Sequence, residues 1–136
     1  MLHARKGRAQ HPQLLLLLLS MATTATRSLH HVVCFDPADS TVCLEAGLAA
    51  PGATTVYLPP QPSSYLTSKP LWLAHSHREV VLAAGVVIEA KTGSFVGYTD
   101  CLLNVGSVTN VTVRGETPWQ QPPAVLRMHK LEYVRH

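Results

Sequence analysis

The stretch from Val80 to Gly106 constrains the fold of this chain more than any other. Two apolar runs rich in β-branched residues flank the polar tetrapeptide Lys91-Thr92-Gly93-Ser94, and a third run ends at Leu103. Apolar runs of this length, bounded by glycine and polar residues, are typical of consecutive β-strands joined by a tight hairpin. The sequence therefore predicts a hairpin over this stretch.

The remainder of the chain breaks into similarly short segments. Its 136 residues include 10 prolines and 8 glycines, and 46% of them are hydrophobic while 14% are charged. This composition is typical of a folded, β-rich chain and leaves little room for long helices. Further strands are expected over Leu29–Phe35, Thr41–Leu44, Thr54–Leu58, Leu71–Leu73, Val108–Val113 and Val125–Val134. We expect one all-β domain over residues 29–136, a small jelly roll or distorted barrel.

Residues 1–28 are expected to be a leader. Basic residues precede the leucine run Leu14–Leu19, and small residues follow it. This order is typical of a secretory signal peptide, although the run is too short to span a bilayer. The alternative is a disordered extension, with translation starting at Met1 or at Met21.

The cysteines and one glycosylation sequon bear on the compartment. Cys34, Cys43 and Cys101 are odd in number and scattered, which fits buried thiols in a reducing compartment at least as well as disulfides. The tripeptide Asn110-Val111-Thr112 is an acceptor sequon for N-glycosylation, which has meaning only in the secretory pathway. The cysteines and the sequon therefore do not decide between a reducing compartment and the secretory pathway.

Charge and motif content narrow the classes of function. The net charge of +3 comes from basic residues in the leader, and a body without a basic stripe argues against nucleic-acid binding. His75 and His77 would share one face of a strand as half of a metal site, but no third ligand follows, so we expect surface histidines and no metal. A nucleophile elbow and a phosphate-binding loop are both absent from the sequence.

Gly85 to Gly106 resembles the trimeric, all-β dUTPase family. Gly85 is followed by aliphatic residues and by a turn that ends at Gly93, and the next run ends in Asn104-Val105-Gly106. The loop Pro62-Ser63-Ser64-Tyr65 is similar to a tyrosine-containing loop of that family. The resemblance spans roughly residues 40–134, marks Gly85, Gly93, Asn104 and Gly106 as fold residues, and implies a jelly roll that can form a homotrimer.

The chain departs from that family at the residues that would carry the chemistry. Ile88 stands where the family has its aspartate, and Lys91 stands where it has a tyrosine. Glu89 is the nearest acid, but in a regular strand it faces away from Ile88. The resemblance therefore implies a degenerate domain with no catalytic residues and no cofactor, and Mg²⁺ would matter only if hydrolysis remained.

Three functions are open from the sequence. The resemblance implies a catalytically inactive accessory protein of viral type, which binds host proteins and modulates host signalling in the cytoplasm or nucleus. The leader and Asn110 favour instead a small secreted or lumenal β-sandwich glycoprotein with a binding role. The third is a dUTP pyrophosphatase with displaced motifs. None of the three requires a transmembrane span or a nucleic-acid partner.

Overall fold

The structure is a computed structural model that describes residues 27–97, 100–116 and 119–129. Most of the predicted leader lies outside the described residues. In chain order the described elements are β1 (Leu29–His31), α1 (Thr41–Leu48), β2 (Thr55–Leu58), β3 (Tyr65–Thr67), β4 (Leu71–Trp72), β5 (Arg78–Leu82), β6 (Val87–Ala90), β7 (Leu103–Asn104), β8 (Val111–Gly115) and β9 (Val125–Arg127). The prediction of a β-rich domain is confirmed.

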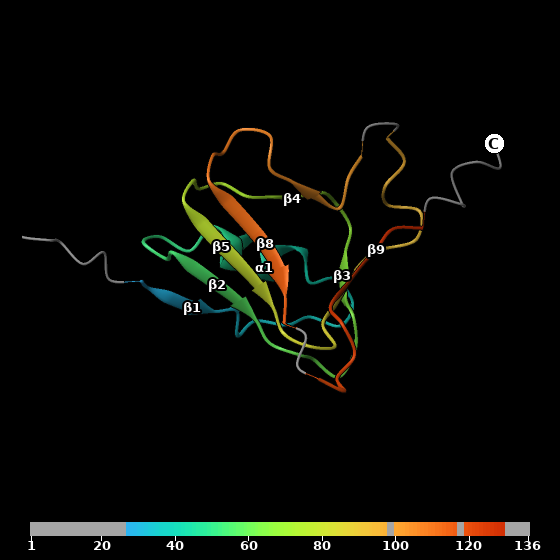
Figure 1. Cartoon of the computed structure of the whole chain (residues 1–136). Helices are drawn as coiled ribbons and strands as arrows, with labels where there is room; N and C mark the ends of the chain where they lie inside the picture. Colours follow the sequence, from blue (N-terminus) through green and yellow to red (C-terminus); the bar gives the residue numbers. More distant parts are fainter. Residues whose placement is uncertain (1–26, 98–99, 117–118, 130–136) are drawn as a thin grey trace, which may run out of the picture.

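The strands form three parallel sheets. We name them sheet A, in the order β1-β2-β5-β8, sheet B, in the order β3-β6-β9, and sheet C, which pairs β4 with β7. Every pair is parallel, and each of the two middle passages of the chain, β2-β3-β4 and β5-β6-β7, adds one strand to each sheet in turn. The chain therefore winds as a short parallel β-solenoid, with sheet A and sheet B on different sides (Figure 1).

The predicted hairpin is wrong, and the predicted jelly roll is not confirmed. Val80–Leu82 belongs to β5 in sheet A, Val87–Ala90 forms β6 in sheet B, and Leu103–Asn104 forms β7 in sheet C. The tetrapeptide at Lys91 does make a turn, in which the Ser94 amide donates to the Lys91 carbonyl at 3.1 Å. Within the described residues β6 pairs in parallel with β3 and β9 from the neighbouring passages, and β7, the next strand after this turn, pairs with β4 instead.

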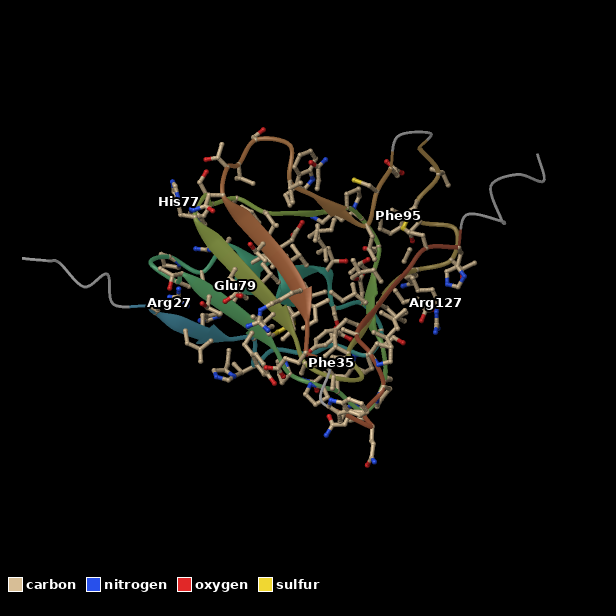
Figure 2. The ribbon with its side chains drawn as sticks, in the orientation of Figure 1. Arg27, Phe35, His77, Glu79, Phe95 and Arg127 are labelled. Carbon is tan, nitrogen blue, oxygen red and sulfur yellow. A yellow bond between two sulfur atoms is a disulfide. The ribbon has the colours of Figure 1, made fainter. Side chains whose placement is uncertain are left out.

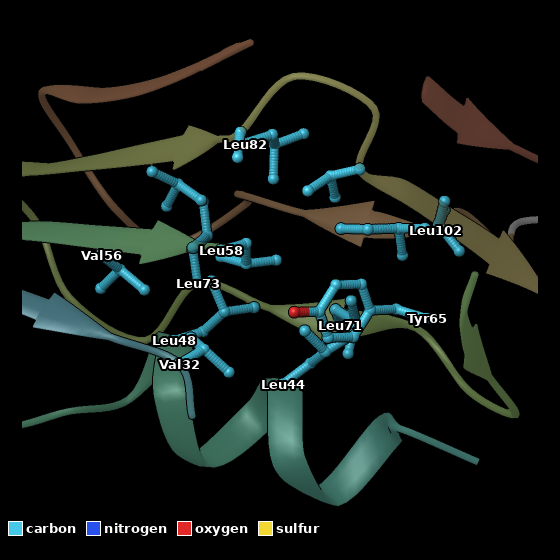
Figure 3. Close-up of a cluster of buried hydrophobic side chains, with 14 of the residues drawn as sticks. Val32, Leu44, Leu48, Val56, Leu58, Tyr65, Leu71, Leu73, Leu82 and Leu102 are labelled. Atoms are coloured by element: carbon cyan, nitrogen blue, oxygen red, sulfur yellow. The ribbon is translucent and has the colours of Figure 1, made fainter. Parts of the chain in front are cut away.

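Side-chain alternation places one face of each strand in a common core. In sheet A, Val56 and Leu58 of β2 stack on Val80 and Leu82 of β5, and all four are buried. From sheets B and C, Tyr65, Ile88 and Leu71 fill the same interior (Figure 3). The outward residues of sheets A and B lie on different sides of the molecule, as Glu79 and Arg127 show in Figure 2.

Glycine makes the corners at two positions that the sequence singled out. Gly85 lies between β5 and β6 with φ +76°, and Gly93 lies in the turn after β6 with φ +75°. L-residues with a side chain rarely adopt this left-handed region, so glycine is favoured at both. Gly85 also donates its amide to the Pro122 carbonyl at 2.8 Å, which ties this corner to the segment before β9.

The segment 41–48 is a helix, so the strand predicted at Thr41–Leu44 is wrong. The buried residues Leu44 and Leu48 are four apart and therefore lie on one helical face, which packs against the core (Figure 3). In this first passage of the chain α1 takes the place of further strands. Tertiary packing overrides the β-propensity of the short run, as propensity is only a weak prior.

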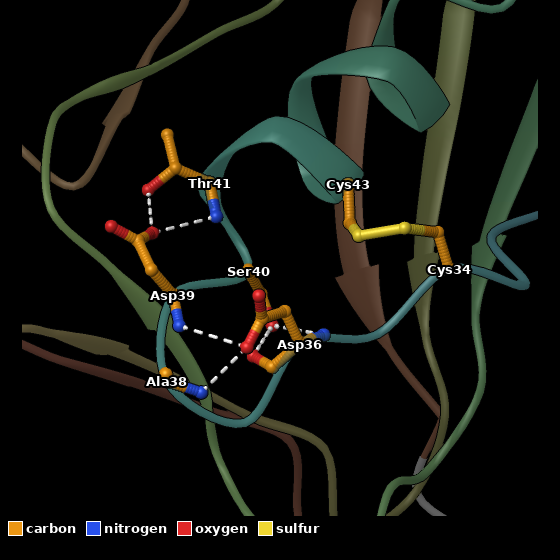
Figure 4. The surroundings of a disulfide bond; sticks show 7 residues. All are labelled: Cys34, Asp36, Ala38, Asp39, Ser40, Thr41 and Cys43. Atoms are coloured by element: carbon orange, nitrogen blue, oxygen red, sulfur yellow. Dashed lines mark hydrogen bonds between the residues drawn. A yellow bond between two sulfur atoms is a disulfide. The ribbon is translucent and has the colours of Figure 1, made fainter.

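A disulfide and an aspartate hold the start of this helix. Cys34, which follows β1, is bonded to Cys43 of α1, with 5.2 Å between the Cα atoms (Figure 4). Of the two alternatives that the sequence left open for the cysteines, this pair forms a disulfide, and Cys101 is free. The Asp39 carboxylate accepts from the Thr41 amide at 2.9 Å, which satisfies a donor in the first turn of the helix.

Acid should destabilise the start of this helix, because it protonates Asp39. Burial alone would raise the pKa of Asp39, but hydrogen bonds from Ser68 and Thr41 and the charge of Lys91 outweigh it and lower the pKa to about 2. A depressed carboxylate pKa stabilises the fold above the unfolded value and loses that contribution as the pH falls toward 2. We expect Asp39→Asn to flatten the fall in thermal midpoint between about pH 4 and pH 2. Circular dichroism melts measure this, and an unchanged slope would contradict it.

Candidate functional site

The outer face of sheet A carries polar side chains in two rows that cross the strands. The parallel register aligns Thr55, Glu79 and Thr112 in the first row. The second row aligns His31, Tyr57, Val81 and Arg114. Residues in one row lie on neighbouring strands, so their backbones are about 4.8 Å apart.

Four of these outward residues, together with Glu116 directly after β8, form what we call the sheet A cluster: His31, Tyr57, Glu79, Arg114 and Glu116. Arg114 Nε donates to Glu79 Oε1 at 2.7 Å, and Tyr57 Oη donates to Glu116 Oε2 at 3.1 Å. The His31 and Tyr57 rings lie 5.0 Å apart, centroid to centroid. Val81 lies within the same row and is buried there.

The charges of the cluster support one another. The hydrogen bond to Glu79 raises the pKa of Arg114, and the negative charges of Glu79 and Glu116 add to this. Burial raises the pKa of Tyr57, and its hydrogen bond to Glu116 raises it further. The cluster therefore combines one guanidinium with two glutamate side chains and a phenol.

A hollow of about 270 Å³ adjoins the cluster at the amino-terminal ends of the sheet A strands. The side chains that line it include Arg27, Thr55, His77, Glu79, Asn110 and Thr112. Figure 2 shows Arg27, His77 and Glu79 on this side of the molecule. Glu79 and Thr112 belong both to the first row and to the hollow, so the two features form one continuous polar surface.

Arg78 holds this end of sheet A from inside. Its side chain points into the solenoid and is only 4% exposed. Nη1 donates to the Leu48 carbonyl, and Nη2 donates to the Ala50 carbonyl at 2.8 Å. These carbonyls lie at and beyond the end of α1, where the backbone has no helical partner to offer. Burial lowers the pKa of Arg78.

The degenerate positions named from the sequence lie elsewhere, on sheet B. Ile88 is buried in the core, whereas Glu89 points outward from the next position of β6. Glu89 pairs with Arg127 at 3.0 Å and with His129 at 2.9 Å. Burial would raise the pKa of Glu89, but the hydrogen bonds from His129 and Ser64 and the charge of Arg127 lower it. Lys91 is exposed, and its Nζ lies 3.5 Å from the Ala38 carbonyl.

The other residues that the sequence singled out occupy turns. Asn104 accepts the Gly106 amide through Oδ1 at 2.9 Å, which closes the turn after β7. Asn110 is exposed at the corner before β8, where φ is +53°, and its side-chain amide donates to His77 Nδ1 at 2.9 Å. His77 is the matching corner residue before β5, with φ +57°.

His75 and His77 are exposed loop residues, as expected, and they do not share the face of a strand. Both lie in the loop between β4 and β5. His75 Nε2 lies 3.2 Å from the Ala49 carbonyl, and His77 pairs with Asn110. Within the described ranges, no group of three or more His, Cys, Asp or Glu side chains could hold a metal ion.

Comparison of the chain with protein-family models, with curated proteins and with solved structures finds no match. The class of protein therefore comes from the geometry: a short parallel β-solenoid with a polar outer face on sheet A. Among the residues described, no helix is long and apolar enough to cross a membrane. Tyr57, Arg114 and Glu116 carry no motif by which the sequence alone would mark them, because only the pairing of distant strands brings them together.

Proposed function

We propose that this protein is a secreted or lumenal β-domain glycoprotein with a binding role. The observation that carries the proposal is the disulfide between Cys34 and Cys43. Disulfides form and persist in oxidising compartments and are rare in the cytosol. The signal-like leader, with its leucine run Leu14–Leu19, favours the same compartment.

The position of Asn110 supports the glycoprotein part of the proposal. Its side chain is exposed at a corner of the solenoid, so an attached glycan would lie in solvent. The amide of Asn110 has two N–H groups, of which one donates to His77. Glycosylation consumes one N–H, so the remaining one can keep that hydrogen bond.

The host-protein-binding function implied by the dUTPase resemblance stays a prediction, as does the dUTP pyrophosphatase alternative. Both depend on a jelly roll, and the parallel pairing of β2 with β5 and of β6 with β3 lends no support to one. A homotrimer likewise stays a prediction of that resemblance.

Expression of the full chain in a eukaryotic secretory host tests the proposal. We expect the protein to be found in the medium or in the secretory lumen, with an N-terminus near Thr26. One cysteine should react with an alkylating agent before reduction of the protein, and three should react after it. A glycosidase should remove mass from the wild type and from Thr112→Ser, but not from Asn110→Gln or Thr112→Ala, because the sequon needs a hydroxyl at its third position. Cytosolic protein with three reactive cysteines and no glycan would overturn the proposal.

A further inference from the structure

We propose that the sheet A cluster and the adjoining hollow bind a neutral oligosaccharide. The inference deepens the binding role proposed above and rests on it. The surface is continuous, because Glu79 and Thr112 line the hollow while Glu79 also pairs with Arg114 of the cluster.

The hydrogen-bonding inventory of the surface matches hydroxyl groups. Arg114 can only donate and the carboxylates of Glu79 and Glu116 only accept, whereas the hydroxyls of Thr55 and Thr112, which line the hollow, can do both. A sugar hydroxyl also donates and accepts, so it can pair with each of these groups in turn. The bond from Arg114 to Glu79 uses only Nε, which leaves the two Nη groups to donate to a ligand.

The balance of charge argues against other classes of ligand. Two carboxylates, Glu79 and Glu116, face Arg114, and Arg27 lies at the hollow, so the surface is not the basic stripe that a nucleic acid requires. Protein interfaces depend on buried aromatic or apolar anchors. Here Val81 is already buried and the hydroxyl of Tyr57 is bonded to Glu116, so neither side chain is free to serve as such an anchor for a protein partner.

The dimensions suit an extended chain of small rings. The second row crosses the four strands of sheet A and so extends over roughly 14 Å at the usual strand spacing. The hollow of about 270 Å³ lies just below the roughly 300–1,000 Å³ of small-molecule sites, which fits one sugar unit better than a larger ligand. The rings of His31 and Tyr57, which lie at a tilt of 57° to one another, belong to the second row and can flank a further ring.

Titration of the folded, disulfide-bonded protein with neutral hexasaccharides tests the inference. The probes are linear hexamers of glucose, mannose and xylose, with heparin as a charged comparison, and calorimetry measures the affinity. We expect saturable binding of at least one neutral hexamer, and a loss of about tenfold or more for Arg114→Gln, because hydrogen bonds from charged groups contribute roughly 1.5–3 kcal/mol. Tyr57→Ala should also weaken binding.

The pair of Arg127 and Glu89 on sheet B supplies a matched control. Its separation of 3.0 Å resembles the 2.7 Å of Arg114 and Glu79, and the side chains of the two arginines are 51% and 49% exposed. Arg127→Gln should therefore leave the affinity unchanged, and circular dichroism checks that each variant is folded. The absence of binding for every neutral hexamer, an equal loss in Arg127→Gln, or preferential binding of heparin would each overturn the inference. If the protein keeps its disulfide and Asn110 glycan while no sugar binds, only this inference fails and the proposed function stands.

Discussion

Replacing Arg78 with alanine should lower the free energy of unfolding by about 3–5 kcal/mol. The guanidinium is buried and donates to the Leu48 and Ala50 carbonyls, which join the end of α1 to the start of β5. Alanine would leave both carbonyls buried without these donors and would open a cavity beneath sheet A. Each unsatisfied carbonyl costs about 1–3 kcal/mol, so the two account for most of the loss.

Urea unfolding followed by circular dichroism measures this effect. Arg78→Met keeps most of the volume but none of the donors, and Arg78→Lys keeps a charged donor. The loss in the free energy of unfolding should therefore be largest for alanine, smaller for methionine and smallest for lysine. Arg127→Ala is the control, because its exposed ion pair with Glu89 should contribute about 1 kcal/mol or less. If Arg78→Ala were no more destabilising than Arg127→Ala, the bonds to the two carbonyls would not stabilise the fold. Should the alanine variant fail to fold, the methionine and lysine variants still give the ranking.

Short-range patterns in the sequence predicted several strands correctly. The runs Thr54–Leu58 and Leu71–Leu73 contain β2 and β4, and Val125 begins β9 as expected. These strands alternate inward and outward residues or lie between turn residues, which are local signals. Gly85 and Gly93 were equally visible, because glycine between apolar runs indicates a corner.

The partners of the strands could not be predicted in the same way. Sheet A pairs Thr55 with Glu79 and Glu79 with Thr112, and the second of these separations is longer because the loop after β6 is long. Passages of unequal length hide the repeat that would identify a solenoid. Neighbouring apolar runs then resemble a hairpin, although the hydrogen bonds join successive passages of the chain.

The residues of the candidate site could not be predicted from the sequence either, because the site depends on which strands pair. Arg114 and Glu79 are 35 residues apart, and only the pairing of β5 with β8 brings their side chains together. The disulfide was also undetermined, since three cysteines allow three different pairs. Alternation along a strand separates inward from outward side chains, but it does not say which outward residues of different strands are neighbours.

Replacing Tyr65 with alanine should lower the free energy of unfolding by about 3–5 kcal/mol, in the range of large aromatic truncations in protein cores. The resemblance placed this tyrosine in a loop, whereas the structure places it in β3 with no exposed surface. Its ring meets Phe35 edge-on, with 5.3 Å between the centroids, and its hydroxyl donates to the Pro59 carbonyl at 2.8 Å. Alanine would lose the ring contacts and the hydrogen bond together, and would leave a cavity where α1, sheet B and sheet C meet.

Two further variants divide this loss between packing and hydrogen bonding. Tyr65→Phe keeps the ring and removes only the bond to Pro59, so it should cost about 1 kcal/mol. Tyr57→Ala truncates the same kind of side chain on the partly exposed outer face of sheet A, and should cost less than Tyr65→Ala because less buried surface is removed. Urea unfolding of the three proteins measures the order. A Tyr65→Phe loss close to that of Tyr65→Ala would mean that the hydroxyl, and not the ring, stabilises this part of the core, whereas equal losses for Tyr57→Ala and Tyr65→Ala would contradict the placement of Tyr65 at the centre of the solenoid.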